Sequence, residues 1–133
     1  MNELIIEAKI ENIDKVLSFV SEHLDDCSFG IQNQIEIAVD ELFSNIARYA
    51  YNPTTGGGAA VRVAVNEAVT IEFEDSGVEY NPLLKEDPDV TLSDDERGIG
   101  GLGIFMVKNM MDSVEYRREG HKNILTIKKN LGS

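Results

Sequence analysis

The sequence has one cysteine, few basic residues and no long apolar run, and each shortage excludes a class of protein. Cys27 alone cannot build an internal disulfide framework. No stretch approaches the roughly 20 apolar residues that span a bilayer, and the opening "MNELIIEAKIEN" lacks the features of a signal peptide. Only 12 lysines and arginines stand against 24 acidic residues, a formal net charge of −12, whereas nucleic-acid binding needs clustered basic side chains. We therefore expect a cytoplasmic protein that binds neither membrane nor nucleic acid.

Common nucleotide signatures are missing as well. The chain contains no G-x-x-x-x-G-K-[S/T], no H-R-D and no D-F-G, so the P-loop and the usual protein-kinase motifs are excluded. It also has no internal repeat and no linker long enough to separate two domains. At 133 residues we expect a single domain covering residues 1–133.

The hydrophobic pattern predicts alternating groups of strands and helices. Period-2 and helical spacings predict strands at 3–10, 61–65, 69–75, 113–119 and 123–130, and helices at 12–24, 31–50 and 102–111. Asn66 and Glu67 join two of these strands in what we expect to be a hairpin. The order predicts an α+β fold, a two-layer α/β sandwich whose mixed sheet is mostly antiparallel, with helices on one face.

Residues 76–101 form a long segment with little periodicity, many acidic residues and two of the three prolines. Loops of this length inside a compact domain are usually functional or disordered. We expect a lid over a ligand site, with disorder as the alternative.

A glycine-rich stretch ends this segment, and Gly98, Gly100 and Gly103 spell G-x-G-x-x-G. A dinucleotide fingerprint should follow a buried strand and begin a βαβ unit, but here the glycines follow "SDDE" and only 30 residues remain after Gly103. The dinucleotide interpretation is therefore excluded. Glycines before a helix also let backbone N–H groups approach a phosphate. A hinge that packs Leu102 onto the sheet explains them equally well.

A second candidate site lies in "QIEIAVDELFSNIARYAY". At about 100° per residue, Glu41 and Asn45 share the flank of the apolar stripe, and Asp40 points to the opposite flank. A carboxylate and an amide one turn apart can provide a general base and an oxygen ligand for Mg²⁺. An ordinary solvated helix flank is the alternative.

The third candidate follows the strand "VTIEFED". Asp75 can accept a hydrogen bond from an adenine amino group, whereas guanine would present a carbonyl oxygen there, and Gly77 lets the backbone pass close to the base. A plain D-S-G turn is the alternative.

Three motifs follow one another along the chain: E-x-x-x-N on a helix, D-x-G after a strand and G-G-L-G before a helix. In this order they resemble the motifs of the GHKL ATP-binding superfamily with its Bergerat fold. Within it, "DELFSNIARYAY" and "GGLGIFMVKNMMDSVEY" are most similar to the anti-sigma-factor serine/threonine kinases of bacterial partner-switching systems. The resemblance runs from the first predicted strand to the last. Tyr49, where the family often has histidine, and Glu79, after D-x-G, depart from the pattern.

The resemblance implies a role for each matching residue. Glu41 would be the catalytic carboxylate and Asn45 the ligand of Mg²⁺. Asp75 and Gly77 would read adenine. The nucleotide phosphates would lie against Arg97, Gly100, Gly101, Leu102 and Gly103.

The implied reaction is transfer of the ATP γ-phosphoryl group to a serine or threonine of a STAS-type antagonist, with a sigma factor as the alternative partner and a homodimer left open. A binding module that sequesters its partner without chemistry is the second hypothesis. Retention of Glu41 favours the kinase, because ATP binding alone does not require that residue.

Overall fold

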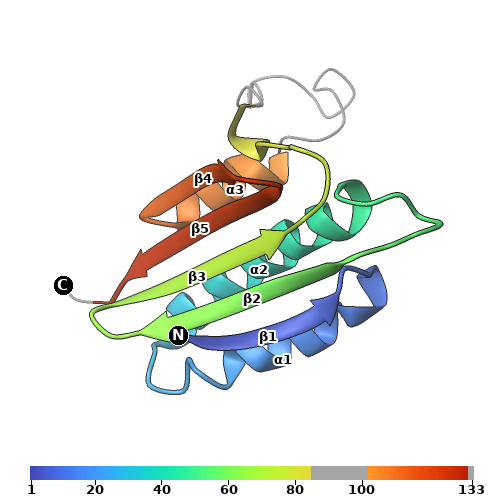
Figure 1. Ribbon diagram of the computed structural model, residues 1–133. Coiled ribbons are helices and arrows are strands. Elements are labelled where there is room, and N and C mark those ends of the chain that lie inside the picture. Colours follow the sequence, from blue (N-terminus) through green and yellow to red (C-terminus); the bar gives the residue numbers. More distant parts are fainter. Residues whose placement is uncertain (85–101, 132–133) are drawn as a thin grey trace.

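The computed structural model describes residues 1–84 and 102–131, and its elements alternate much as the pattern predicts (Figure 1). The strands are β1 (Asn2–Glu7), β2 (Gly58–Val65), β3 (Ala68–Asp75), β4 (Ser113–Glu119) and β5 (Lys122–Asn130). The helices are α1 (Ile13–Ser21), α2 (Phe29–Tyr49) and α3 (Leu102–Met110), with short 3₁₀ turns at Ile10–Asn12 and Pro82–Leu84. The predicted α+β class is confirmed.

The five strands form one sheet in the order β1-β2-β3-β5-β4. All four pairings among the described residues are antiparallel, so the sheet carries no parallel pair there and is not mixed. The predicted hairpin at Asn66 and Glu67 joins β2 to β3, with Val65 opposite Val69. Register aligns Asp75 at the end of β3 with Asn123 at the start of β5. This end of the sheet is where the polar residues of the site gather.

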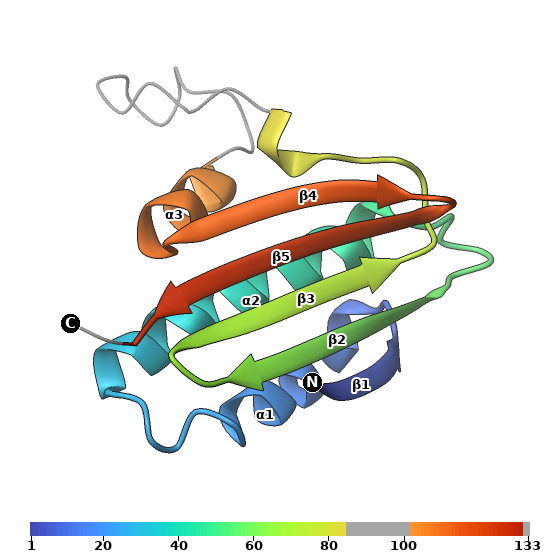
Figure 2. The same cartoon turned by 60° about the vertical axis from the view of Figure 1, so that its left-hand side comes forward.

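The helices cover one face of the sheet (Figure 2). Along most of the sheet, the strand residues that point to this face are apolar, and they pack against buried residues of α1, α2 and α3, among them Val16, Phe43 and Val107. The Ser28 side chain accepts a hydrogen bond from Ile31 N at 3.3 Å, so α2 begins two residues before the predicted start. The long helix α2 thus runs beneath the sheet and presents its C-terminal half to the end of β3.

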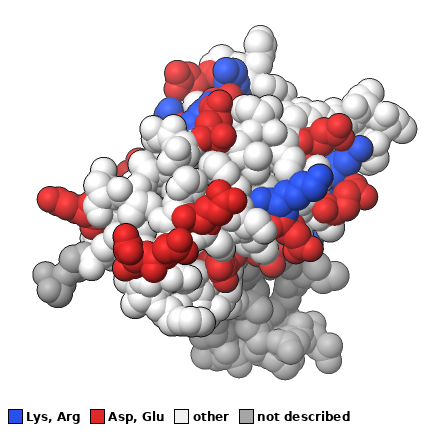
Figure 3. All heavy atoms as spheres, turned by 90° about the horizontal axis from the view of Figure 1, so that it is seen from below, with Lys and Arg blue, Asp and Glu red and all other residues white. Residues whose placement is uncertain are grey.

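The other face of the sheet is charged. Arg62 on β2 forms ion pairs with Glu3, Glu72 and Glu74 on the neighbouring strands. In the view from below in Figure 3, acidic side chains are spread more widely over the surface than basic ones. No helix in residues 1–84 and 102–131 combines the length and apolarity that a membrane crossing requires.

Candidate functional site

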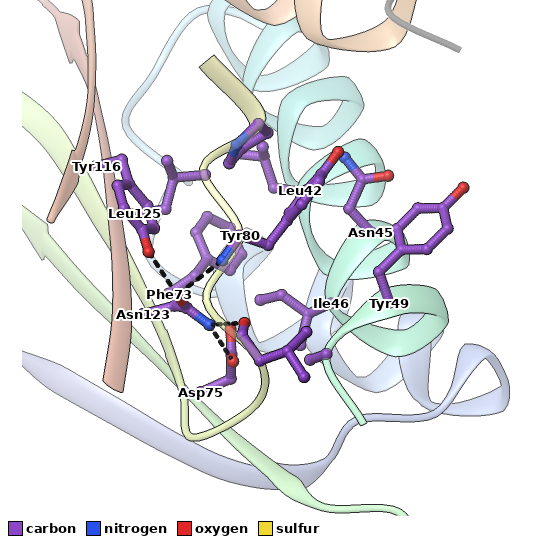
Figure 4. Close-up of a pocket in the computed structure, with 13 residues that line it drawn as sticks. Leu42, Asn45, Ile46, Tyr49, Phe73, Asp75, Tyr80, Tyr116, Asn123 and Leu125 are labelled. Atoms are coloured by element: carbon purple, nitrogen blue, oxygen red, sulfur yellow. Dashed lines mark hydrogen bonds between the residues drawn. The ribbon is translucent and has the colours of Figure 1, made fainter. Parts of the chain in front are cut away.

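A pocket opens between the C-terminal half of α2 and the ends of β3, β4 and β5 (Figure 4). The space within it, including the part open to solvent, is about 440 Å³. Its walls are mostly apolar or aromatic, and a carboxylate and two amide side chains reach it from β3, α2 and β5: Asp75, Asn45 and Asn123. An apolar pocket with a few fixed polar groups is typical of sites for small organic ligands.

Asp75 is the last residue of β3 and is only 6% exposed. Its Oδ1 accepts hydrogen bonds from the Nδ2 group of Asn123 and from the backbone N–H of Gly77, both at 2.9 Å. Within the described part of the chain, no hydrogen bond reaches Oδ2. The carboxylate is therefore fixed through one oxygen and keeps acceptor capacity on the other for a ligand donor.

The turn after Asp75 is pressed against the end of α2. A Cβ atom on Gly77 would collide with the carbonyl oxygen of Ala50, and the next residue, Val78, donates its N–H to that same oxygen at 2.9 Å. Only glycine lets the backbone approach this closely. The predicted close backbone approach at Gly77 is present, and what it approaches here is α2.

We expect Gly77→Ala to lower the free energy of unfolding by about 1–3 kcal/mol, because the added methyl group must displace backbone. Gly30→Ala is the matched control, since a Cβ on Gly30 meets nothing within 4 Å and glycine is a weak helix former. Its free energy of unfolding should be unchanged or higher. Urea denaturation of both variants measures the difference. Equal stability of the two variants would contradict the described packing.

Tyr51 ties the same turn to β2. Its hydroxyl donates to the carbonyl oxygen of Gly58 at 2.6 Å and accepts from the N–H of Ser76 at 2.8 Å. Burial raises the pKa of Tyr51, so the side chain remains a neutral phenol that can donate. The turn after Asp75 is thus fixed by hydrogen bonds to the end of α2 and, through Tyr51, to β2.

Glu41 borders a neighbouring hollow, between α2 and α3. A Cβ atom on Gly103 would overlap the Glu41 carboxylate, which places that carboxylate against the first turn of α3. The partial positive charge of a helix N-terminus favours an anion at this position. Asp40 also borders this hollow, although the helical spacing predicts it on the flank opposite Glu41. Asp40 accepts a hydrogen bond from Ser44 at 3.2 Å.

The predicted site residues fall into three groups. Asn45 and Asp75 line the pocket, with Gly77 behind Asp75. Glu41 and Gly103 meet at the adjoining hollow, and Leu102 begins α3. The expected phosphate residues Arg97, Gly100 and Gly101 lie outside the described residues.

Two further expectations meet the structure only in part. The first nine residues of the predicted lid, 76–84, are hydrogen-bonded to Ala50, Tyr51 and Asn123, and Pro82 is buried, so this part is a fixed wall of the pocket. The remainder of the lid lies outside the described residues. Within the described ranges, no group of three or more histidine, cysteine, aspartate or glutamate side chains could hold a metal ion. A Mg²⁺ ion at Asn45 would need further oxygen ligands from a nucleotide and water.

Asn123 and the tyrosines of the pocket are not among the site residues predicted from the sequence. Asn123 is buried opposite Asp75, and Tyr49, Tyr80 and Tyr116 line the same pocket. A signal was present, because Asn123 takes an inward position in a strand whose next inward residues are Leu125 and Ile127. A polar residue at such a position indicates either a packing defect in the core or a functional site.

Curated relatives of this chain are named as kinases. It is 27% identical over 112 residues to the serine/threonine-protein kinase BtrW of Bordetella bronchiseptica, covering 80% of this chain and 78% of that one. It is 26% identical over 105 residues to the serine-protein kinase RsbW of Listeria monocytogenes, covering 74% and 67%.

Solved structures share the fold. A crystal structure of the RsbU and RsbW domains of a Mycobacterium tuberculosis protein matches with a TM-score of 0.64 at 15% identity, over 98% of this chain and 33% of that chain. The histidine kinase domain of a blue-light activated histidine kinase from Erythrobacter litoralis matches with a TM-score of 0.56 at 18% identity, over 92% and 60%. This chain thus spans about a third of the first neighbour.

The model of one protein family covers nearly the whole sheet and all three helices. It is described as the histidine kinase-like ATPase domain and matches residues 6–129, from the last two residues of β1 almost to the end of β5. The pocket, its carboxylate acceptor Asp75 and the helix that carries Glu41 and Asn45 all fall within this range. The chain therefore belongs to the histidine kinase-like ATPase domain family.

Proposed function

We propose that this protein is an ATP-dependent serine/threonine kinase of the partner-switching type, which phosphorylates a STAS-type antagonist protein. The observation that carries the proposal is the arrangement on α2. Asn45 faces the pocket that contains Asp75, and Glu41, one turn earlier, borders the hollow beside it. The names of the two curated relatives support the kinase class.

The pocket suits adenine for a chemical reason. Asp75 offers a carboxylate oxygen between apolar walls formed by residues such as Ile46, Phe73 and Leu125. An adenine amino group would donate to that oxygen, whereas guanine would place a carbonyl oxygen against it. Tyr49 and Tyr80, with ring centroids 6.0 Å apart, add aromatic surface at the same pocket.

The residues present also fit a nucleotide with its metal ion. The Asn45 side chain is half-buried and lines the pocket, so its amide oxygen is placed to be a single protein ligand of Mg²⁺. Bound ATP would supply the γ-phosphoryl group and be released as ADP, and Mg²⁺ would neutralise charge on the phosphate oxygens. Glu41 would accept the hydrogen bond of the partner's hydroxyl group and take up its proton during the transfer.

One observation favours the second candidate, a nucleotide-gated binding module without chemistry. The Glu41 carboxylate lies against Gly103 and borders the hollow, not the pocket that Asn45 and Asp75 line.

If the protein is a kinase, the partner's hydroxyl group must enter that hollow. The partner surface would then insert between α2 and α3, and Ile37 and Met106 at the rim are exposed apolar side chains that it can contact.

Phosphoryl transfer distinguishes the two candidates. We expect ATP labelled on its γ-phosphate to label a STAS-type protein encoded near this one, and to do so only when Mg²⁺ is present. The control is the same partner with its acceptor serine or threonine replaced by alanine. If the partner forms a complex in the presence of ATP but never carries the label, the protein is the binding module.

A further inference from the structure

The Asn123 side chain takes part in five hydrogen bonds with described residues, and it is buried, with 6% of its surface exposed. Register places it in a row across three strands, between Asp75 on β3 and Arg118 on β4 (Figure 4 shows Asp75 and Asn123). All three residues therefore point to the helix-covered face at the same end of the sheet.

The amide nitrogen of Asn123 serves two acceptors. Nδ2 donates to Oδ1 of Asp75 at 2.9 Å and to the carbonyl oxygen of Val78 at 2.8 Å. Both protons of the NH₂ group are thus in use. One bond orients the carboxylate, and the other fastens the backbone that forms the opposite wall of the pocket.

The amide oxygen faces donors only. Oδ1 accepts from the hydroxyl of Tyr116 at 2.6 Å, from Nη1 of Arg118 at 3.1 Å and from the N–H of Tyr80 at 3.3 Å. A flipped amide would set its NH₂ group against these donors and its oxygen against Asp75 and Val78. The surroundings therefore fix one orientation of Asn123.

We propose that Asn123 is the positioning residue for base selection, which holds Asp75 so that a single carboxylate oxygen faces the base. This rests on the proposed function, since it assigns how the same pocket chooses adenine. Asn123 acts through Asp75 and through the wall of Val78 and Tyr80. Without it, Gly77 N–H is the one remaining described donor to Asp75 Oδ1, and the carboxylate can rotate away from the base.

The expected effect is on selectivity as well as affinity. A hydrogen bond to a charged group is one of the stronger kinds in proteins, so we expect Asn123→Ala to weaken ATP binding about tenfold. GTP binding gains nothing from the Asp75 oxygen and should change little, so the ratio of the two dissociation constants should fall by a similar factor. Tyr116→Phe removes one orienting bond and keeps the Nδ2 bonds, so its ratio should fall about twofold to threefold.

The test is calorimetric titration of ATP and GTP, with Mg²⁺, into the full chain and its variants. Asn130→Ala is the matched control, because Asn130 lies at the other, exposed end of β5. It should retain the ratio of the parent protein. A merely structural role for Asn123 would lower the unfolding temperature and leave the ratio unchanged.

The possible outcomes separate this inference from the proposed function. A lower ratio in Asn123→Ala and in Tyr116→Phe supports the inference. If the parent selects ATP and both variants keep its ratio, the inference is overturned and the proposed function stands. If the parent protein does not bind ATP, the proposed function is contradicted, and the inference that rests on it is overturned as well. Should Asn123→Ala not fold, the ratio measured for the milder Tyr116→Phe decides between support and refutation.

Discussion

Glu41→Gln is expected to reduce phosphoryl transfer to the partner by about a hundredfold to ten-thousandfold and to leave the affinity for ATP within a few fold. The glutamine keeps the shape and helix propensity of glutamate but cannot take up a proton. ATP would be held by Asn45, Asp75 and the pocket walls, none of which this change touches. Single-turnover transfer rates and calorimetric affinities, measured on the same preparation, check both parts.

Two other variants make this test specific. Asp40→Asn should be nearly silent, although Asp40 borders the same hollow, because its carboxylate is engaged by the Ser44 hydroxyl. Gly103→Ala should slow transfer, since its methyl group would occupy the place of the Glu41 carboxylate, which sits at the end of a flexible chain and can move aside. Full transfer activity in Glu41→Gln would remove it from the catalytic role. Loss in Asp40→Asn alone would transfer that role to Asp40.

Asp75→Asn should weaken ATP binding by about tenfold to a hundredfold and shift selectivity toward GTP. The new amide would turn its oxygen toward the Asn123 and Gly77 donors, because these already hold Oδ1 of the aspartate. Its NH₂ group would then face the pocket, where it opposes the adenine amino group and suits the guanine carbonyl. Competition titrations with ATP and GTP measure the shift.

Glu74→Gln is the control for charge alone. Glu74 is the neighbouring carboxylate on β3 but points to the opposite face, where it pairs with Arg62 and Lys122. Its loss should leave both nucleotide affinities unchanged. Equal losses of ATP affinity in Asp75→Asn and Glu74→Gln would mean that the net charge of the chain, and not the pocket, governs binding.

Much of the fold follows from local pattern. The apolar stripe of α2, the hairpin at Asn66 and Glu67 and the C-terminal strand pair all occur where periodicity predicts them. Element ends are shifted, because caps and turns decide them. The Ser28 cap starts α2 early, and β1 ends at Glu7, three residues before the predicted limit, with a 3₁₀ turn following it.

Site residues could be predicted only where one continuous segment contains both the chemical group and the element that orients it. Asp75 and Asn45 could be identified as candidates from the sequence, because the end of a strand orients the first and the flank of an amphipathic helix orients the second. Asn123 could not be assigned a role, because its partners Asp75 and Tyr116 come from other strands and only register brings them together. The same is true of Asp40, whose hollow exists only once α3 packs beside α2.

We expect the pocket at the end of β3 to select an adenine nucleotide through Asp75, and titration with two nucleotides measures this selection. Mg²⁺–ATP and Mg²⁺–GTP are titrated separately into the unmodified protein under identical conditions. We expect saturable binding of ATP at one site per chain, with GTP weaker by about tenfold or more. Equal affinity for the two nucleotides, or binding of neither, would contradict it.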